Sequence, residues 1–212
     1  WTSIKLYFMI GLPYETLEDV VEIANLGKEV VDVFYTLPKE ERKRGVNVTL
    51  SVSSFVPKPF TPFQWARQNT IEELHEKQMA VKKNIKSKHI KYNYHESKLS
   101  VLEGVFARGD RRLGKVLLKA HELGAKFDSW NEGFDMEKWE KAFLECGMDY
   151  SFYTRERSYE EILPWDFIDI GITKKFLQSE NERAKNAQTT PNCRVKCASC
   201  GAAVFGGGVC FE

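Results

Sequence analysis

The stretch IKLYFMIGLPYETLED, residues 4–19, decides the expected fold of this chain. It opens with an apolar run that ends at Gly11, and Thr16 with Asp19 three residues later forms a capping-box pattern, which is typical of a helix start. A buried strand followed at once by a helix is characteristic of a parallel sheet. We therefore expect a strand over residues 4–10, interior to its sheet, and then a helix of about 18 residues.

A second strand-like segment, residues 46–56, follows a charged turn, so the first part of the chain reads as a βαβ unit with a right-handed crossover. The next residues, 57–63, contain three prolines, which disfavour both helix and strand pairing. We expect the sheet to end there. Because two strands cannot complete a parallel sheet, we also expect partner strands from an upstream part, which makes this chain the C-terminal part of a longer protein.

The remainder is predicted to be mainly helical, in three segments overall: residues 1–66 with the strands, 67–187 with helices, and 188–212 as a cysteine-rich tail. Caps and apolar periodicity place helices from Thr70, over 99–107, 113–123 and 136–145, and from Thr173 to about residue 187, with a short strand at 90–94. Five lysines gather around the end of the helix that begins at Thr70 (Lys82, Lys83, Lys86, Lys88, Lys91). They indicate a solvated helix end, with an RNA phosphate contact as the alternative.

The composition excludes several classes of protein. The 212 residues carry a formal charge of +1, with 42% hydrophobic and 13% aromatic residues, which argues against disorder and against a strongly basic nucleic-acid binder. No apolar run approaches the roughly 20 residues that span a bilayer, and no secretory pattern opens the chain. We expect a globular protein of the reducing cytoplasm with no membrane partner.

Four of the five cysteines lie in the tail, at Cys193, Cys197, Cys200 and Cys210. Four thiols so close together in a reducing compartment indicate a metal site rather than disulfides. The sequence from Cys197 to Gly201 is typical of a zinc knuckle, whereas Cys-x3-Cys-x2-Cys with a fourth cysteine also suits a [4Fe-4S] cluster. Both metals stay open, and Cys210 is the weakest of the four proposed ligands because a glycine run precedes it.

Residues 4–19 and 51–65 (SVSSFVPKPFTPFQW) resemble two consecutive strands and turns of radical S-adenosylmethionine (SAM) enzymes. Three later blocks, RGDRRLG at 108–114, KFDSW at 126–130 and LPWDFIDIGITKKFL at 163–177, resemble the subgroup with an N-terminal cobalamin-binding-like domain. The resemblance implies an α/β fold: the C-terminal part of a radical SAM partial (β/α) barrel, with its last strands in residues 1–66, followed by a mainly helical region.

The resemblance also implies a ligand site. Met9, Ile10, Gly11 and Glu15 match the strand and turn that pass SAM in such enzymes. Ser53, Ser54 and Phe55, at the carboxyl end of the next strand, would border the same cavity, because ligands gather at that end of parallel strands. The family's own cluster motif lies upstream of the Gly-Leu-Pro strand, whereas the tail cysteines follow every strand. The resemblance thus places the main [4Fe-4S] cluster in the missing N-terminal part and makes the tail an auxiliary iron–sulfur or zinc site.

The function implied by the resemblance is that of an enzyme in which a reduced [4Fe-4S] cluster cleaves SAM to a 5′-deoxyadenosyl radical. The parent protein would bind cobalamin if the subgroup's extra domain is functional, and the substrate, a small molecule or RNA, is not indicated. An alternative reading from the residues alone is a non-catalytic helical module with a zinc knuckle that binds RNA or a protein partner. Metal content and SAM cleavage distinguish the two.

Overall fold

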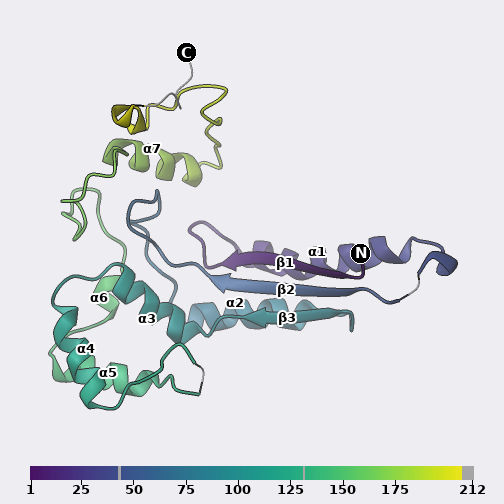
Figure 1. The fold of residues 1–212 in the computed structure, drawn as a ribbon, viewed down its shortest axis with the longest axis horizontal. Coiled ribbons are helices and arrows are strands. Elements are labelled where there is room, and N and C mark those ends of the chain that lie inside the picture. Colours follow the sequence, from purple (N-terminus) through teal and green to yellow (C-terminus); the bar gives the residue numbers. More distant parts are fainter. Residues whose placement is uncertain (43, 131, 207–212) are drawn as a thin grey trace. The chain divides into compact units, whose positions relative to one another are not determined.

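Three parallel strands form the sheet of this protein in a computed structural model that describes residues 1–42, 44–130 and 132–206 (Figure 1). They are β1 (Ser3–Ile10), β2 (Asn47–Ser54) and β3 (Ile90–Tyr94), in the order β1-β2-β3. Between β1 and β2, the paired residues run from Ser3 opposite Asn47 to Ile10 opposite Ser54. Between β2 and β3, they run from Val48 opposite Ile90 to Val52 opposite Tyr94. The carboxyl ends of all three strands therefore point the same way.

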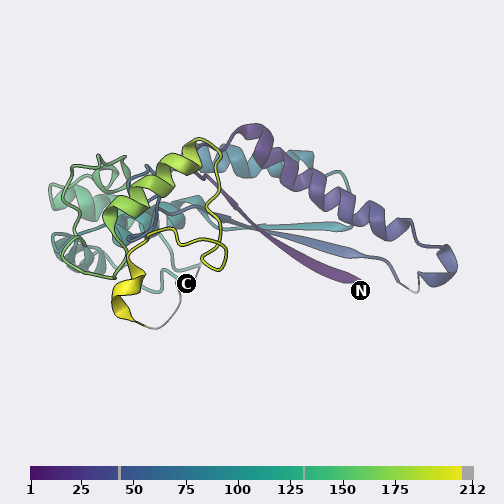
Figure 2. The same ribbon diagram turned by 90° about the horizontal axis from the view of Figure 1, so that it is seen from above.

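The two crossover helices, α1 (Leu17–Tyr35) and α2 (Ile71–Asn84), lie on one face of the sheet (Figure 2). Both begin at a complete capping box, formed by Thr16 with Asp19 and by Thr70 with Glu73. The first box and the cap at Thr70 confirm the prediction. The core between helices and sheet is built from alternate strand residues and from the facing sides of the helices, namely Ile10, Val20, Ile23, Ala24, Val31, Val46, Val48, Leu50, Val52 and Val81. A Cβ at Gly27 of α1 would lie 3.0 Å from Leu50 Cδ2, so this glycine lets helix and strand approach closely.

The opposite face of the sheet carries the other half of each strand. β1 contributes Ser3, Lys5, Tyr7 and Met9, all exposed, and β2 contributes Asn47, Thr49, Ser51 and Ser53, which are exposed or half-buried. The period of two in a strand produces this division, because successive side chains point to opposite faces. The helix-free face is thus largely polar, with Tyr7 and Met9 as its large apolar groups.

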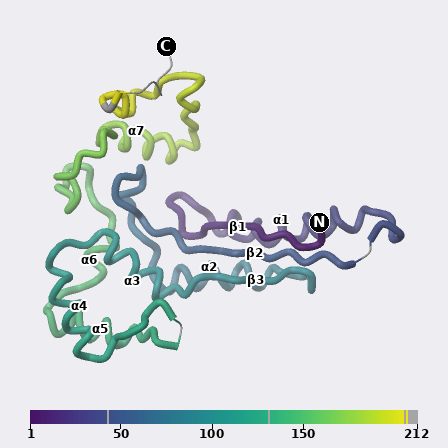
Figure 3. Tube along the Cα trace, viewed as in Figure 1, coloured from purple at the N-terminus to yellow at the C-terminus, as the bar shows by residue number. Residues whose placement is uncertain are grey.

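The predicted partial barrel is wrong. The described residues form an open three-stranded sheet in which β1 occupies an edge rather than an interior position. Closure into a barrel requires more strands and a staggered register that brings the two edges together. The expectation that the sheet ends at the proline loop is also wrong, since β3 pairs with β2 in parallel after the crossover through α2. Figure 3 follows this path along the chain.

The chain divides into two compact units: unit 1 comprises Trp1–Val56 and Asn69–Leu102, and unit 2 comprises Pro57–Gln68 and Glu103–Glu212. This division cuts across the three expected segments, because α2 and β3 join the sheet whereas the proline loop belongs to unit 2. The helix α3 (Ser97–Ala107) contains the boundary. Along the chain, η1 (Lys39–Glu41) precedes β2.

Unit 2 holds α4 (Leu113–Glu122), α5 (Met136–Glu145), α6 (Ser151–Thr154), α7 (Lys174–Lys185) and η2 (Ala202–Phe205). The predicted helices at 113–123, 136–145 and from Thr173 match α4, α5 and α7 closely, whereas α6 and η2 were not predicted. Gly124 and Gly147 follow α4 and α5 at positive φ, as helix-ending glycines do. One core of this unit joins the proline loop to the C-terminal part through Trp65, Leu163, Trp165 and Leu177. Within the described ranges, no helix has the length and apolar character needed to cross a membrane.

Candidate functional site at the carboxyl edge of the sheet

The turn after β1 depends on Gly11. This residue has φ +84°, and a Cβ built on it would lie 3.0 Å from Leu74 Cδ2 and 3.3 Å from Asn69 Oδ1. Any other residue would meet both backbone strain and a crowded neighbour. The sequence therefore needs glycine here to pass from strand to helix beneath the start of α2.

Glu15 holds this turn in place. Its two carboxylate oxygens accept from the backbone N–H of Gly11 at 2.8 and 3.1 Å, and Lys77 Nζ of α2 lies 2.7 Å from Oε1. The side chains of Glu15 and Lys77 are only 8% and 17% exposed. Because the carboxylate is already occupied, Glu15 acts on the site by positioning the turn.

Met9 and Ser53 are neighbours in the register of β1 and β2, one residue before the end of each strand. Met9 is 46% exposed on the helix-free face, and Ser53 is half-buried beside it, with its Oγ donating to Phe8 O at 3.2 Å. These two predicted site residues come together at the carboxyl edge, the end of a parallel sheet where ligands gather.

Ile10 and Ser54 lie on the inner side of the same edge, and Phe55 directly follows β2. All three are buried, and Phe55 N–H donates to Ile10 O at 2.8 Å, which continues the β1–β2 pairing past the strand ends. The Ser54 hydroxyl is enclosed without a hydrogen-bond partner among the described residues. The predicted set is therefore split between two faces, because adjacent strand residues point in opposite directions.

A cavity of about 620 Å³ opens beside the turn, between the outer edge of β1 and α1. Its lining combines apolar groups with acidic ones: Phe8, Met9, Leu12, Pro13, Tyr14, Glu15, Asp19, Glu22, Ile23, Leu26 and Glu29. The volume lies in the range of small-molecule sites. A ligand with a positive charge and an apolar or aromatic part would match this lining.

Sequence reasoning missed the acidic side of this cavity. Glu22 follows Asp19 by three residues, and Glu29 follows Glu22 by seven, so all three lie on one side of α1. This helical spacing could have been recognised in the sequence. Thr16 donates to Asp19 through its backbone N–H and its hydroxyl, which holds the pKa of that carboxyl below its ordinary value. Asp19 therefore carries its negative charge at neutral pH.

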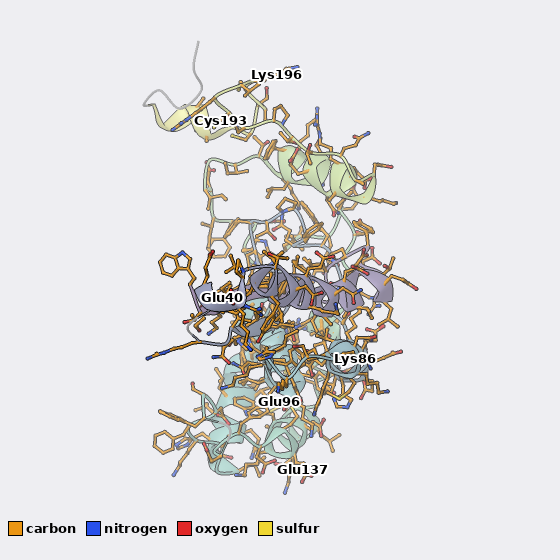
Figure 4. The ribbon with its side chains drawn as sticks, turned by 90° about the vertical axis from the view of Figure 1, so that its right-hand side faces the viewer. Glu40, Lys86, Glu96, Glu137, Cys193 and Lys196 are labelled. Atoms are coloured by element: carbon orange, nitrogen blue, oxygen red, sulfur yellow. The ribbon has the colours of Figure 1, made fainter. Side chains whose placement is uncertain are left out.

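Cys193, Cys197 and Cys200 lie in unit 2, where Cys193 and Lys196 occupy the loop after α7 (Figure 4). Cys193 and Cys197 are exposed and Cys200 is half-buried. The backbone N–H of Ser199 donates to Cys197 Sγ at 3.4 Å, Ser199 and Gly201 both have positive φ, and Thr173 N–H donates to Cys200 O at 2.8 Å. This turn has the N–H to sulfur contact expected of a metal-binding knuckle, and it is anchored at the start of α7.

The complete set of tail ligands is not assembled in the described part of the chain. Across residues 1–42, 44–130 and 132–206, no three His, Cys, Asp or Glu side chains gather closely enough to hold a metal ion. Cys210, the proposed fourth ligand, lies outside these residues. Thiolates of Cys197 and Cys200 fit a soft metal by their chemistry and by the turn between them.

Part of the chain is similar to a known archaeal protein. The chain is 36% identical over 115 residues to the uncharacterized protein MJ0966 of Methanocaldococcus jannaschii. The match covers 54% of this chain and 23% of the relative, so the chain spans less than a quarter of that protein's length. No family model matches the chain. No solved structure matches it either.

Proposed function

We propose that this chain is the C-terminal portion of a radical SAM enzyme, in which the carboxyl edge of the sheet forms part of the SAM site. The proposal starts from the five sequence blocks that resemble this family. The upstream part of the same polypeptide would supply the main [4Fe-4S] cluster, and its sequence and the substrate are open. We further propose that the enzyme works in the reducing cytoplasm.

The observation that carries the proposal is the meeting of Met9 and Ser53. The resemblance points to both residues from segments more than 40 positions apart, and the parallel register makes them direct neighbours beside the Gly11 turn. This end of a parallel sheet is where ligands bind. The polar helix-free face of β1 and β2 then offers hydroxyls to a ligand, while Glu15 and Lys77 keep the turn fixed.

The cavity beside the turn supports SAM as the ligand class. SAM carries a sulfonium and an ammonium group together with an adenine ring. Asp19, Glu22 and Glu29 supply negative charge, and Tyr14, 54% exposed, supplies an aromatic surface. When bound, the reduced cluster would deliver an electron to SAM and so yield a 5′-deoxyadenosyl radical. The residues of this chain would bind and orient SAM and exclude water from it.

The test uses the complete polypeptide that contains this chain, purified without oxygen and reduced with dithionite. The expected result is iron of at least one cluster and formation of 5′-deoxyadenosine from SAM. Met9→Ala and Ser53→Ala should raise the KM for SAM, whereas Tyr7→Ala, a control on the same face of β1 farther from the carboxyl end, should leave it unchanged. Absence of 5′-deoxyadenosine from an iron-loaded protein would refute the proposal.

The knuckle at Cys197 favours a second candidate, a zinc-binding helical module without catalysis that docks RNA or a protein. The Ser199 N–H to Cys197 Sγ contact is the observation on its side, because such contacts stabilise a metal-bound thiolate. In the enzyme proposal, the same tail holds an auxiliary [4Fe-4S] cluster or zinc. A protein that contains zinc alone and leaves SAM intact would support the module.

A further inference from the structure

Arg108, directly after α3, is a buried cation with unused donors. Its side chain is fully buried, and Nη2 donates weakly to Gln64 O at 3.4 Å. Nε and Nη1 have no hydrogen-bond partner among the described residues. Burying a guanidinium in this way is unfavourable unless an anion satisfies it.

Arg157 forms the second half of the cluster. It is 4% exposed, its Nη2 donates to Arg108 O at 2.9 Å, and its guanidinium lies over the Trp165 ring at 5.3 Å from the centroid. Its backbone N–H donates to Trp65 O at 2.9 Å. Its Nε has no hydrogen bond within the described ranges and only approaches Glu161 Oε1 at 4.0 Å. Three segments of unit 2 thus hold two arginines beside each other in a dry environment.

The carboxylates around this pair are already engaged by other arginines. Arg155 binds Glu161 with two hydrogen bonds, of 2.9 and 2.8 Å. Arg112 binds Asp110 in the same bidentate way, with its Nη2 2.7 Å from Oδ2. Glu161, Asp110 and Arg155 are the charged groups that act on the buried pair, together with Tyr153 as a titratable neighbour. Two positive charges, those of Arg108 and Arg157, therefore lack a carboxylate of their own.

We infer that Arg108 and Arg157 form a binding site for a dianionic oxyanion of the phosphate class. The four arginines of this cluster, at positions 108, 112, 155 and 157, outnumber the carboxylates of Asp110 and Glu161 by two. A dianion would balance this excess, whereas a carboxylate ligand would balance only half of it. Guanidinium N–H pairs also match the spacing of phosphate oxygens. The Trp165 ring covers the Arg157 guanidinium and shields it from water, which strengthens such contacts. This site is independent of the proposed SAM site in unit 1.

The electrostatic state of Arg108 agrees with an anion-dependent site. Burial, together with the nearby Arg157 and Arg155, lowers the pKa of Arg108 to about 10. A bound dianion would stabilise the charged form and raise this value again. The side chain is enclosed, so entry of the anion requires local opening of the irregular segments on either side, residues 57–68 and 155–161.

The test is isothermal calorimetry and thermal unfolding of this chain with inorganic phosphate, at constant ionic strength set with chloride. Phosphate should bind and raise the unfolding temperature, and acetate should do so far less. A phosphomonoester such as glycerol phosphate serves as a further arm that separates free phosphate from a phosphorylated small molecule. Arg108→Met and Arg157→Met should each weaken phosphate binding by about tenfold or more.

Two further variants keep the result interpretable. Arg111→Met is the matched control, since it removes an exposed arginine from the same RGDRR segment and should change the affinity by less than about twofold. Glu161→Gln removes a competing negative charge at nearly constant size, so it should tighten phosphate binding even if Arg108→Met fails to fold. Equal effects of phosphate and chloride on the unmodified chain, or weaker phosphate binding by Glu161→Gln, would overturn the inference.

Discussion

Lys77 Nζ lies 2.7 Å from Glu15 Oε1, and the same carboxylate accepts from the backbone N–H of Gly11. One ion pair thus joins α2 to the turn that ends β1. Because both side chains are largely buried, each charge depends on the other for solvation. The carboxyl edge of the sheet, where Met9 and Ser53 meet, is held in shape by this contact.

Removal of one member of the pair should therefore destabilise unit 1. We expect Lys77→Met to lower the free energy of unfolding by about 3 kcal/mol, because it leaves the Glu15 carboxylate buried without its cation. Urea denaturation followed by circular dichroism measures this. The control is Lys28→Met, which breaks the exposed pair of Lys28 with Asp32 and should cost about 0.5 kcal/mol or less. Equal losses for the two variants would show that the buried pair does not hold the turn.

Two glycines should respond to alanine in opposite directions. Gly11→Ala should destabilise the chain by about 1–3 kcal/mol, because it forces a Cβ at φ +84° against Leu74. Gly114→Ala in α4 has open space around its Cβ and should stabilise the helix by about 0.5–1 kcal/mol. Thermal and urea unfolding of both variants check the signs. A neutral Gly11→Ala would contradict the strain assigned to this turn.

The stability of unit 2 should fall in acid through Glu161. Hydrogen bonds from Arg155 hold the pKa of this carboxyl below its ordinary value of 4.5, with help from the charges of Arg155, Arg157 and Arg108. A lowered folded-state pKa adds stability above pH 4.5, and this stability is lost as the pH falls through the folded-state value. Urea titrations at pH 6 and at lower pH should show this loss in the unmodified chain. Glu161→Gln should flatten that part of the profile, and an unchanged profile would count against the pairing.

Substitution of a tail cysteine should remove bound metal, whereas substitution of Cys146 should not. Cys197→Ser and Cys200→Ser should each lose most of the bound iron or zinc, because a thiolate ligand and the knuckle turn are removed together. Cys146→Ser, in a half-buried position after α5, should retain it. Elemental analysis of anaerobically purified protein measures the outcome. Retention of full metal content by both tail variants would exclude this turn as a ligand site.

Local features of the fold could be read from the sequence with little error. The capping boxes at Thr16 and Thr70 begin α1 and α2 at the predicted residues, and Gly124 follows α4 in the expected conformation. These signals depend on residues within one helical turn of each other. The βαβ unit and the meeting of Met9 with Ser53 follow from the same local patterns combined with parallel pairing.

Other features could not be predicted because they depend on partners far apart in the chain. Apolar and polar residues alternate in β3, which allowed this short strand to be predicted. Nothing in its local sequence indicated that it pairs with β2 in the sheet. The occupation of the Glu15 carboxylate by Lys77 joins residues 62 positions apart. The burial of Arg108 was also hidden, since its RGDRR segment reads as an exposed turn.

The amino-acid sequence by itself determined most of the helices and strands, the residues at which α1 and α2 begin, and the concentration of soft-metal ligands in the tail. These properties follow from backbone propensity, capping and side-chain chemistry over short distances. The tertiary structure alone decided that the sheet is open with β1 at its edge, that Glu15 is a positioning group, and that two arginines are buried without their own carboxylates. Those outcomes depend on which segments, far apart in the chain, pack together and exclude water. The residues around a position in the sequence do not indicate burial of that kind.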